Sequence, residues 1–526
     1  MREEMSKSVA LNRKFSDLLK RALELDRAIK IGWGKGDDPK PHEGEMGVAP
    51  HIPEGARVRM LGNLADMVAV CASGGSFILE GEAAGYFGAW NDGCRLVVER
   101  DCGARAGYAM TSGRIVLQGS AGAEVGARMG GGDLVVRGSA GRRCGAGMSG
   151  GTVVVIGDVD GDVGCNMSGG RIIVNGRCPP AGEGAISNTL TKAELKDVNE
   201  LLDDLDLKVA ADAVCIRTDE DTPTTAEAPA VGIDSDFGGI SLVSATGTRL
   251  HAHSPLDLLT LISNRDSEKG AVLLPLPVLP LLADGKGLKG TLLSRQPCLV
   301  RSAPRSVDLL LVDESNLAGC AADLQTSAGA VVSIRDLPPL NDAELDALLV
   351  VVRSHLGDNK PVILSGDLTR VQKVHRLADD LDCDGACIQL ASSAMLPAAA
   401  ALPVIALSGR EQDLAAHGVS GSIHLPWSPS ASDLLIAAAA GASMTVADPF
   451  AADASPPSSQ KGRAAAVEDW LAGIDAGIRG WLVELGEDGI DRLNRRHLRA
   501  LDHDTASVSG LRLSGWERPL PQWLGQ

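Results

Sequence analysis

The chain has 526 residues, 44% of them hydrophobic and only 3% aromatic, a length that predicts roughly two to four domains. Its formal net charge of −18 argues against a nucleic-acid binder, because such proteins normally present a basic face. No apolar run reaches the ~18–20 residues that span a bilayer and the N-terminus lacks a signal-peptide core, so we expect a cytoplasmic protein that has no membrane partner.

Residues 1–55 predict a helix followed by a docking loop. Apolar residues recur at helical spacing over 8–31, which indicates an amphipathic helix. The next segment, 32–47, is rich in glycine, proline and charge and is typical of a linker. Its His42 and Glu43 would be within reach of a partner.

From about residue 56 to 180 one phrase recurs every 19 residues. Three times a glycine lies three residues before a methionine, and a glycine pair, a short apolar run and another glycine follow; Met110 is in the same phase, and Asn91 and Ala72 occupy this position upstream. The repeated glycine and methionine positions are Gly107, Met110, Gly126, Met129, Gly145, Met148, Gly164 and Met167. The apolar runs occupy 76–80, 95–99, 114–118, 133–137, 152–156 and 171–175, with 57–61 as a less regular copy.

This fixed period predicts a right-handed, single-stranded β-helix of about six or seven coils within residues 56–215. Each coil would supply one short strand, and its glycines would allow positive φ at the corners. The methionines would stack as an inward ladder, in preference to the alternative of a soft-metal site. A phosphate-binding role for the glycines is not favoured, because the sequence lacks a strand–GxGxxG–helix unit and a GxxxxGK[ST] motif.

These G-x-x-M-x-G-G coils resemble the GXGXG domain. That domain closes the large subunit of glutamate synthase and forms the body of one of the subunits of formylmethanofuran dehydrogenase. It also occurs as a separate subunit of methylamine–glutamate N-methyltransferase. In these families the domain carries no catalytic residue and holds catalytic domains in register, so the resemblance implies a structural role.

Two features follow the repeat. The segment 191–207 predicts a helix that Thr191 opens with Glu194 as a capping box, and we expect it to cover the open end of the stack. Residues 216–232 are polar and rich in proline and threonine, which is typical of an interdomain linker.

Residues 233–450 change to apolar runs that alternate with helices, a pattern that predicts a parallel sheet and, by its strand count, a TIM-barrel-like α/β domain. The expected strands are 239–245, 270–276, 307–313, 329–335, 360–366, 385–391, 402–408, 421–427 and 442–448. The expected helices are 342–357, 368–382 and 432–441. Residues 451–526 predict one or two further helices, over 464–497, and a tail.

This half resembles the FMN-binding barrel of glutamate synthase over roughly 330–505. The similar segments are KPVILSGD, DCDGACIQL, DLLIAAAAGASMTVADP and GWLVELGEDGIDRLNRRHLRALD. The family's D-G-G-T-G-A turn is replaced by ASSAMLPAAAAL at 391–402, and residues 447–459 lack its three-cysteine cluster. The glutaminase domain is missing as well. The resemblance therefore implies a degenerate barrel with no iron–sulfur centre, in which bound FMN is an alternative to the absence of any cofactor.

A few side chains are candidates for a site. His251 and His253 form an H-x-H that could bind a metal after a barrel strand, with His424 and Asp448 as further ligands.

Charged residues also end two expected strands, as Asp313 with Glu314 and as Arg335 with Asp336. For a cofactor phosphate, the only clustered cations are Lys286, Lys289 and Arg295.

The preferred interpretation is a structural subunit of a glutamate-synthase-like complex, of the amidotransferase or one-carbon (N-methylglutamate) type. Its β-helix would organise partner subunits, such as a glutaminase-type or a flavin subunit. One alternative is an FMN-dependent oxidoreductase that transfers nitrogen to a 2-oxo acid. A second alternative is a metal-dependent hydrolase.

Overall fold

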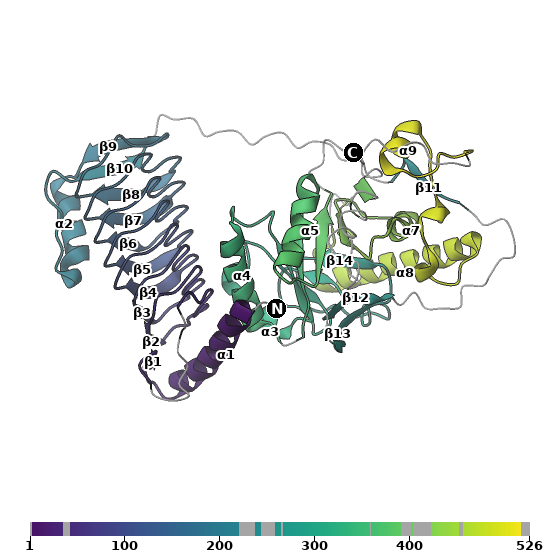
Figure 1. Cartoon of the computed structure of the whole chain (residues 1–526), viewed down its shortest axis with the longest axis horizontal. Helices are drawn as coiled ribbons and strands as arrows, with labels where there is room; N and C mark the ends of the chain where they lie inside the picture. Colours follow the sequence, from purple (N-terminus) through teal and green to yellow (C-terminus); the bar gives the residue numbers. More distant parts are fainter. Residues whose placement is uncertain are drawn as a thin grey trace. The chain divides into compact units, whose positions relative to one another are not determined.

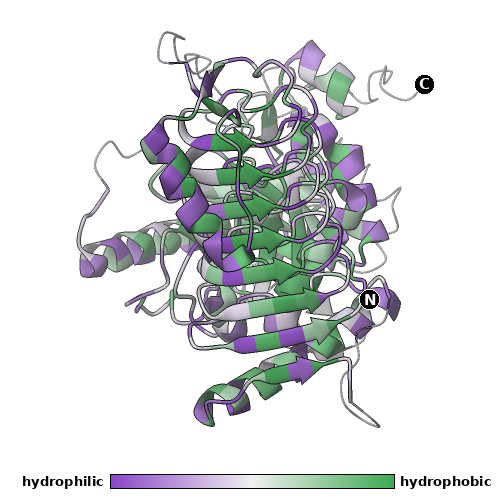
Figure 2. Ribbon diagram, turned by 90° about the vertical axis from the view of Figure 1, so that its left-hand side faces the viewer, coloured by the Kyte–Doolittle hydropathy of each residue, from purple (hydrophilic) through white to green (hydrophobic). Residues whose placement is uncertain are grey.

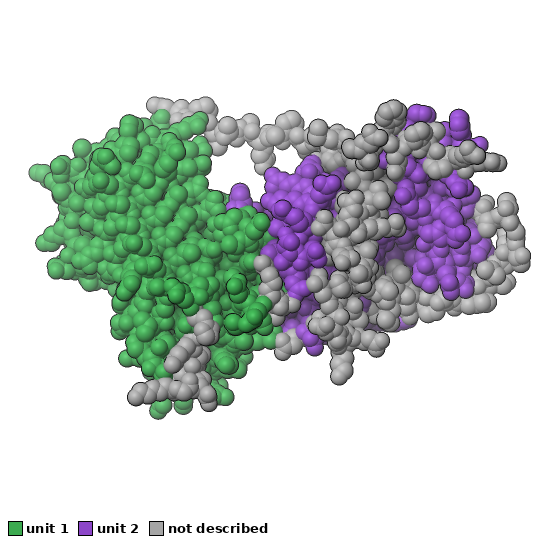
Figure 3. Space-filling view, viewed as in Figure 1, with its two compact units in different colours: residues 1–227, 317–321, 340–355 green, residues 228–316, 322–339, 356–526 purple. Residues whose placement is uncertain are grey.

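The computed structural model of the chain describes residues 3–34, 41, 43–219, 237–243, 258–264, 267–357, 359–390, 401–402, 405, 422–451 and 456–516. The chain forms two compact units, coloured separately in Figure 3. Unit 1 comprises Met1–Glu227, Leu317–Ala321 and Leu340–His355, and unit 2 comprises Ala228–Asn316, Ala322–Pro339 and Leu356–Gln526.

Unit 1 is built on a ten-stranded sheet in the order β1-β2-β3-β4-β5-β6-β7-β8-β10-β9 (Figure 1). The strands are β1 (Ile29–Ile31), β2 (Arg57–Leu61), β3 (Ser76–Glu80), β4 (Asp92–Val98), β5 (Ser112–Leu117), β6 (Asp133–Val136), β7 (Ser149–Val155), β8 (Gly169–Val174), β9 (Ala185–Thr189) and β10 (Val214–Thr218). From β2 to β8 the pairing is parallel and joins residues 19 apart, such as Phe77 with Leu96. The period that the sequence predicts is therefore confirmed as the register of the stack.

Each coil is also paired on a second side. Isolated parallel bridges link Leu64 to Ala83, and then Cys102, Ala121, Ala140 and Val159 follow in the same register. The segments that connect one strand to the next would have no backbone partners if only the strands paired. The bridges join each connecting segment to the equivalent segment 19 residues further along, so both sides of the stack advance by the same step.

At the corners of the coils every second residue has a positive φ angle. Tyr86, Gly88 and Trp90 all have positive φ (59°, 62° and 54°), and equivalent residues follow in later coils. The Tyr86 N–H donates to Ala104 O in the next coil, at 2.8 Å, whereas the Gly88 N–H donates to Val68 O in the preceding coil, at 2.9 Å. Hydrogen bonds to the coils on both sides stabilise this left-handed backbone conformation, which residues other than glycine rarely adopt.

One core runs through the coils. It contains the four ladder methionines, which are all buried, together with the inward residues of the strands. Figure 2 shows the predominantly hydrophobic colour of the stacked strands. Asn91 is in phase with the methionines and is fully buried. Its Nδ2 donates to Cys94 O at 2.9 Å and to Ser112 O of the next coil at 3.3 Å, and its Oδ1 accepts from Cys94 N at 3.1 Å, so the buried polar group is satisfied.

Two expectations for the flanks of the repeat were wrong. The helix expected over 8–31 is α1 (Glu3–Glu24), and Ile29–Ile31 instead forms β1, which pairs with β2. The helix α2 (Lys192–Leu202) has the predicted capping box, but it does not cover the end of the stack. Its Val198 and Leu202 pack in one cluster with Val135, Val154 and Ile173. These three residues alternate with the inward ones, so α2 covers the outer face of β6–β8.

The last strands of the sheet are antiparallel. β10 pairs with β8 on one side and with β9 on the other. β10 includes Ile216–Thr218, so the sheet extends into the segment that the sequence predicts as a linker.

Unit 2 contains a closed barrel of eight parallel strands, which confirms the predicted barrel. The strands in order are β14 (Val278–Leu282), β15 (Leu299–Val300), β16 (Leu309–Val312), β17 (Gly329–Ser333), β18 (Val362–Asp367), β19 (Gly385–Gln389), β20 (Ser422–Leu425) and β21 (Met444–Ala447). Their Val, Leu and Ile residues are buried, apart from the partly buried Leu281, as expected for parallel strands covered on both faces.

Three of the expected barrel strands were wrong. Ile240–Leu242 forms β11, which pairs with β22 (Leu498–Ala500) outside the barrel. The run at 270–276 falls in β13 (Ser267–Leu274), which forms an antiparallel pair with β12 (Leu258–Asn264). Within 402–408, the described residues Leu402 and Ile405 are helical. The barrel uses β14 and β15 instead, which the sequence analysis missed because β14 contains a proline and β15 has two residues.

Five of the barrel strands are followed by a helix in the described part of the chain. These helices are α3 (Ala321–Thr326), α4 (Asp342–His355), α5 (Val371–Asp380), α7 (Ala431–Ala440) and α8 (Gln460–Leu485), whereas α9 (His503–Ser509) follows β22. Although α4 follows β17 in the sequence, it belongs to unit 1, where it packs against α1. There Asn12 Nδ2 donates to Ser354 Oγ at 2.9 Å. Among the helices that the structure describes, none is long and apolar enough to cross a membrane.

Candidate functional site

The carboxyl ends of the barrel strands bring polar side chains from distant parts of the sequence to one edge of the sheet. In barrels of this kind the active site lies at that edge. The polar residues at or just after the strand ends are Arg301, Asp313, Ser333, Arg335, Asp336, Ser365, Gln389 and His424.

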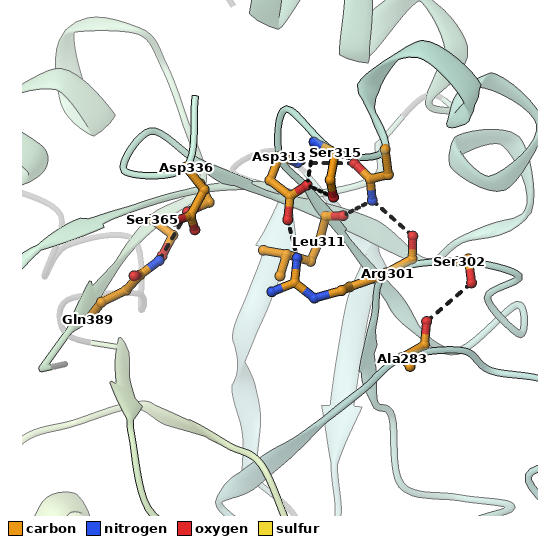
Figure 4. A network of polar contacts seen from close by, with 11 residues as sticks. Ala283, Arg301, Ser302, Leu311, Asp313, Ser315, Asp336, Ser365 and Gln389 are labelled. Carbon is orange, nitrogen blue, oxygen red and sulfur yellow. Dashed lines mark hydrogen bonds and ion pairs between the residues drawn. The ribbon is translucent and has the colours of Figure 1, made fainter. Parts of the chain in front are cut away.

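The first part of this cluster holds Arg301 in place (Figure 4). Arg301 is bonded through its guanidinium to the buried carboxylate of Asp313. The other oxygen of Asp313 accepts from the backbone N–H of Ser315 at 2.9 Å. Asn316 Nδ2 donates to the carbonyl of Arg301 at 2.9 Å, which ties the loop after β15 to the loop after β16. The guanidinium and the backbone carbonyl of Arg301 are thus both held by hydrogen bonds.

The second part centres on the buried amide of Gln389 (Figure 4). Its Nε2 donates to Ser333 Oγ at 3.0 Å and to Ser365 Oγ at 3.1 Å, and its Oε1 accepts from Arg335 at 3.1 Å. Ser333 Oγ in turn donates to Asp336 Oδ2 at 2.7 Å. Because the hydroxyls fix the orientation of the amide, Gln389 presents its oxygen to the guanidinium of Arg335.

His424 completes the cluster at the end of β20. The pKa of His424 is lowered to about 4, mainly by burial and also by the positive charges of Arg301 and Arg335, whereas Asp336 acts in the opposite direction. The imidazole is therefore neutral at pH 7 and can accept a proton.

Two guanidinium groups together with a neutral imidazole suit a small anion. Arginine pairs with carboxylates through its planar fork, and a neutral imidazole offers one N–H donor and one acceptor nitrogen. Both arginines already use part of their donor capacity within the barrel, which orients the remainder.

The described residues do not fit the phosphate of FMN. In the barrel fold such a group lies on backbone N–H groups after the last two strands. Residues 426–430 and 448–459 contain no glycine. The first turn of α7 is already occupied by its own carboxylate, because Asp433 accepts from Ser430 N at 2.8 Å and Ser430 Oγ accepts from Asp433 N.

The predicted cofactor cations do not come together at one pocket. Lys286 lines a pocket beside α8, but neither Lys289 nor Arg295 lines it. His42, His251 and His253 lie outside the described residues.

A metal site is not found among the predicted ligands that the structure describes. Within that part of the chain, which includes His424 and Asp448, no three His, Cys, Asp or Glu side chains are arranged to hold a metal ion.

Sequence reasoning identified the charged strand ends at 313–314 and 335–336 but missed Arg301, Ser333, Ser365 and Gln389. Arg301 follows a strand of two residues that carries no alternating pattern. Gln389, Ser333 and Ser365 lie in apolar runs. A polar side chain as the last or penultimate residue of such a run is the signal that would have found them.

Comparison with known proteins gives matches to solved structures alone. No family model matches the chain, and no curated protein matches it. Among solved structures, a flavocytochrome b2 variant with bound sulfite is 14% identical, with a TM-score of 0.34 over 51% of this chain and 77% of that one. A mandelate oxidase variant with benzoylformic acid is 14% identical, with a TM-score of 0.34 over 49% and 86%. A second mandelate oxidase variant, with a C4a-OH-FMN adduct, is 16% identical, with a TM-score of 0.32 over 49% and 88%.

Proposed function

We propose that unit 2 is a substrate-binding barrel that acts on a small carboxylate, such as a 2-oxo acid, at the carboxyl ends of its strands. The observation that carries this proposal is the neutral imidazole of His424 in the electrostatic field of Arg301 and Arg335. The arginines would bind the carboxylate, and its negative charge would raise the pKa of His424, so that the imidazole takes up a proton when the acid binds. No step through a flavin is included, because the described residues do not fit its phosphate.

The positions of these groups support the proposal. Asp313 is paired with Arg301, whereas Arg335 is bonded to an uncharged amide and the Asp336 carboxylate is held by the Ser333 hydroxyl. Arg335 takes part in none of the ion pairs between described residues, so its guanidinium can turn toward a bound anion more readily than one in a salt bridge can. The resemblance to glutamate synthase implies the 2-oxo acid class and the transfer of nitrogen.

The test is calorimetric titration of the whole chain with 2-oxoglutarate, pyruvate and, as an uncharged control, acetone. We expect the acids to bind and acetone not to bind. The Arg335→Met substitution should weaken binding of the acids at least about tenfold, because a charge-assisted hydrogen bond contributes about 1.5–3 kcal/mol to the binding free energy. Arg376→Gln is the matched control, because Arg376 pairs with Asp380 on the exposed side of α5.

His424→Asn should leave carboxylate affinity within a few fold, and it should abolish proton uptake on binding when heats are compared in buffers of different ionisation enthalpy. If neither acid binds, or if Arg335→Met and Arg376→Gln have the same effect, the proposal is wrong.

A second candidate function is the structural one, in which unit 1 is a right-handed β-helix that organises partner subunits. Unit 1 already holds a helix encoded between two barrel strands. The guanidinium of Arg105 lies 3.6 Å from the Glu344 carboxylate of α4, and His51 bonds to His355. This favours a role for the coils in binding helices. Isolation of the native assembly, with flavin, metal and partner chains counted per chain, tests it: stoichiometric partners without flavin support it, and one flavin per chain would overturn it.

A further inference from the structure

A separate pocket of about 340 Å³ lies at the ends of β14 and β21, beside the start of α8. It draws on the two barrel strands that contribute nothing to the cluster around His424. Leu281, Leu288, Phe450 and Val467 supply apolar walls. Its size falls in the lower part of the range for small-molecule sites, which are mostly apolar with a few polar groups that orient the ligand.

Four charged side chains line this pocket, and two of them neutralise each other. Arg463 bonds to Asp284 Oδ2 at 3.2 Å, and the other Asp284 oxygen accepts from the backbone N–H of Lys286 at 3.0 Å. This pair is internal to the protein and leaves no net charge for a ligand.

The other two charges, Lys286 and Asp448, take part in none of the ion pairs between described residues. Asp448 Oδ1 accepts from the Phe450 N–H at 2.8 Å, which orients the carboxylate. Its second oxygen has no hydrogen-bond donor among the described side chains and backbone groups. The pocket therefore presents one positive and one negative group beside an apolar wall.

The backbone brings Lys286 to this position through a close contact. Gly287 has φ +67°, and a Cβ atom there would lie 2.8 Å from the side-chain carbon Cδ of Gln460 in the first turn of α8. Glycine adopts the left-handed turn readily and lets the loop approach the Gln460 side chain without displacing it. The loop that carries Lys286 thus packs tightly against the helix that lines the opposite wall.

We propose that this pocket binds an apolar α-amino acid as a zwitterion. Asp448 accepts from the α-ammonium group, Lys286 pairs with the α-carboxylate, and the side chain lies against the leucine, phenylalanine and valine residues. A simple anion would leave Asp448 opposed to it, and a simple cation would leave Lys286 opposed to it, so the pair of charges selects the zwitterion.

The test uses the full chain and titrates leucine, methionine, phenylalanine and valine separately by calorimetry. Two leucine analogues each lack one charge: 4-methylpentanoate has no ammonium group, and 3-methylbutylamine has no carboxylate. We expect at least one of the four amino acids to bind. For each amino acid that binds, the analogue without the ammonium group and the analogue without the carboxylate should bind at least about tenfold more weakly, as for loss of a charged hydrogen bond.

The substitutions Asp448→Asn and Lys286→Met should each weaken binding of the amino acid to a similar degree. Lys289→Met is the control, because Lys289 does not line the pocket. The analogues on the unaltered chain decide the question even if a variant folds poorly. Binding of none of the four amino acids, or equal binding of 4-methylpentanoate and leucine, would overturn the proposal. Failure here leaves the site around His424 untouched, because no residue is shared.

Discussion

Single residues at the corners of unit 1 decide how closely the coils can stack. Gly107 has φ +68°, and a Cβ atom there would lie 2.5 Å from Leu134 Cδ1 and 3.3 Å from Ile115 Cδ1 in the core. Its neighbours Arg105 and Ala109 have the same sign of φ but carry side chains. The glycine is therefore required by the space inside the coil as well as by its backbone conformation.

We predict that Gly107→Ala lowers the free energy of unfolding by about 1–3 kcal/mol, because it combines a strained φ with overpacking. Chemical denaturation of the whole chain measures the change. Gly161→Ala is the matched control in the same stack, since nothing lies within 4 Å of its Cβ position and its φ is not positive. An equal loss of stability in both variants would show that the core contact at Gly107 does not matter.

At the scale of elements, a pair of histidines joins the first coil to α4. His51 Nε2 lies 3.1 Å from Leu317 O, so this nitrogen carries the proton, and His51 Nδ1 accepts from His355 Nε2 at 3.0 Å. Burial lowers the pKa of His51 to about 4. Burial also lowers the pKa of His355, to about 3, with smaller contributions from His51 and Lys20. The bond exists only while the rings are not both protonated.

We predict that this pair makes unit 1 less stable as the pH falls below about 6.5. In the unfolded chain both histidines bind protons near pH 6.5, whereas in the folded chain they stay neutral down to about pH 4. The stabilising effect is thus complete above pH 6.5 and is lost as the pH falls toward 4, by up to ~1.4 kcal/mol per pH unit for each proton.

Urea unfolding at pH 7, 6 and 5 measures this dependence. The double variant His51→Asn, His355→Asn should have a smaller slope of unfolding free energy against pH. The single control His503→Asn, on the exposed start of α9, should keep the slope of the unaltered chain. An unchanged slope in the double variant would show that the pair does not titrate on unfolding.

At the scale of the whole molecule, the two units do not follow the order of the chain. Unit 1 takes residues 317–321 and 340–355 from the sequence of the barrel. Asn12, His51 and Arg105 all bond to side chains of α4. A chain cut after residue 227 therefore lacks part of unit 1.

We predict that a fragment of residues 1–227 is less stable than unit 1 within the full chain, because three polar side chains lose their partners and the surface under α4 is exposed. Hydrogen exchange of the peptides around β2 and β3 should be faster in the fragment. Exchange in β7, which has no bond to α4 among the described residues, serves as the internal reference. Equal protection around β2 and β3 in both proteins would contradict the prediction.

Much of the architecture could be predicted from the sequence where the pattern is local. The 19-residue period, the buried methionines and the capping box of Thr191 and Glu194 each depend on residues close together in the chain. Six barrel strands were found in the same way, as short apolar runs rich in branched residues.

The sequence by itself determined the repeat, its register and the alternation of strands and helices, because periodicity is encoded residue by residue. Only the tertiary structure decided that α2 covers the outer face of β6–β8, that α4 belongs to unit 1, and that Arg301, Arg335 and His424 meet at one edge of the barrel. These outcomes depend on which apolar and charged surfaces find each other across tens to hundreds of residues of chain. No local pattern records such pairings, because closing long loops is compensated only by contacts that form once the whole fold is in place.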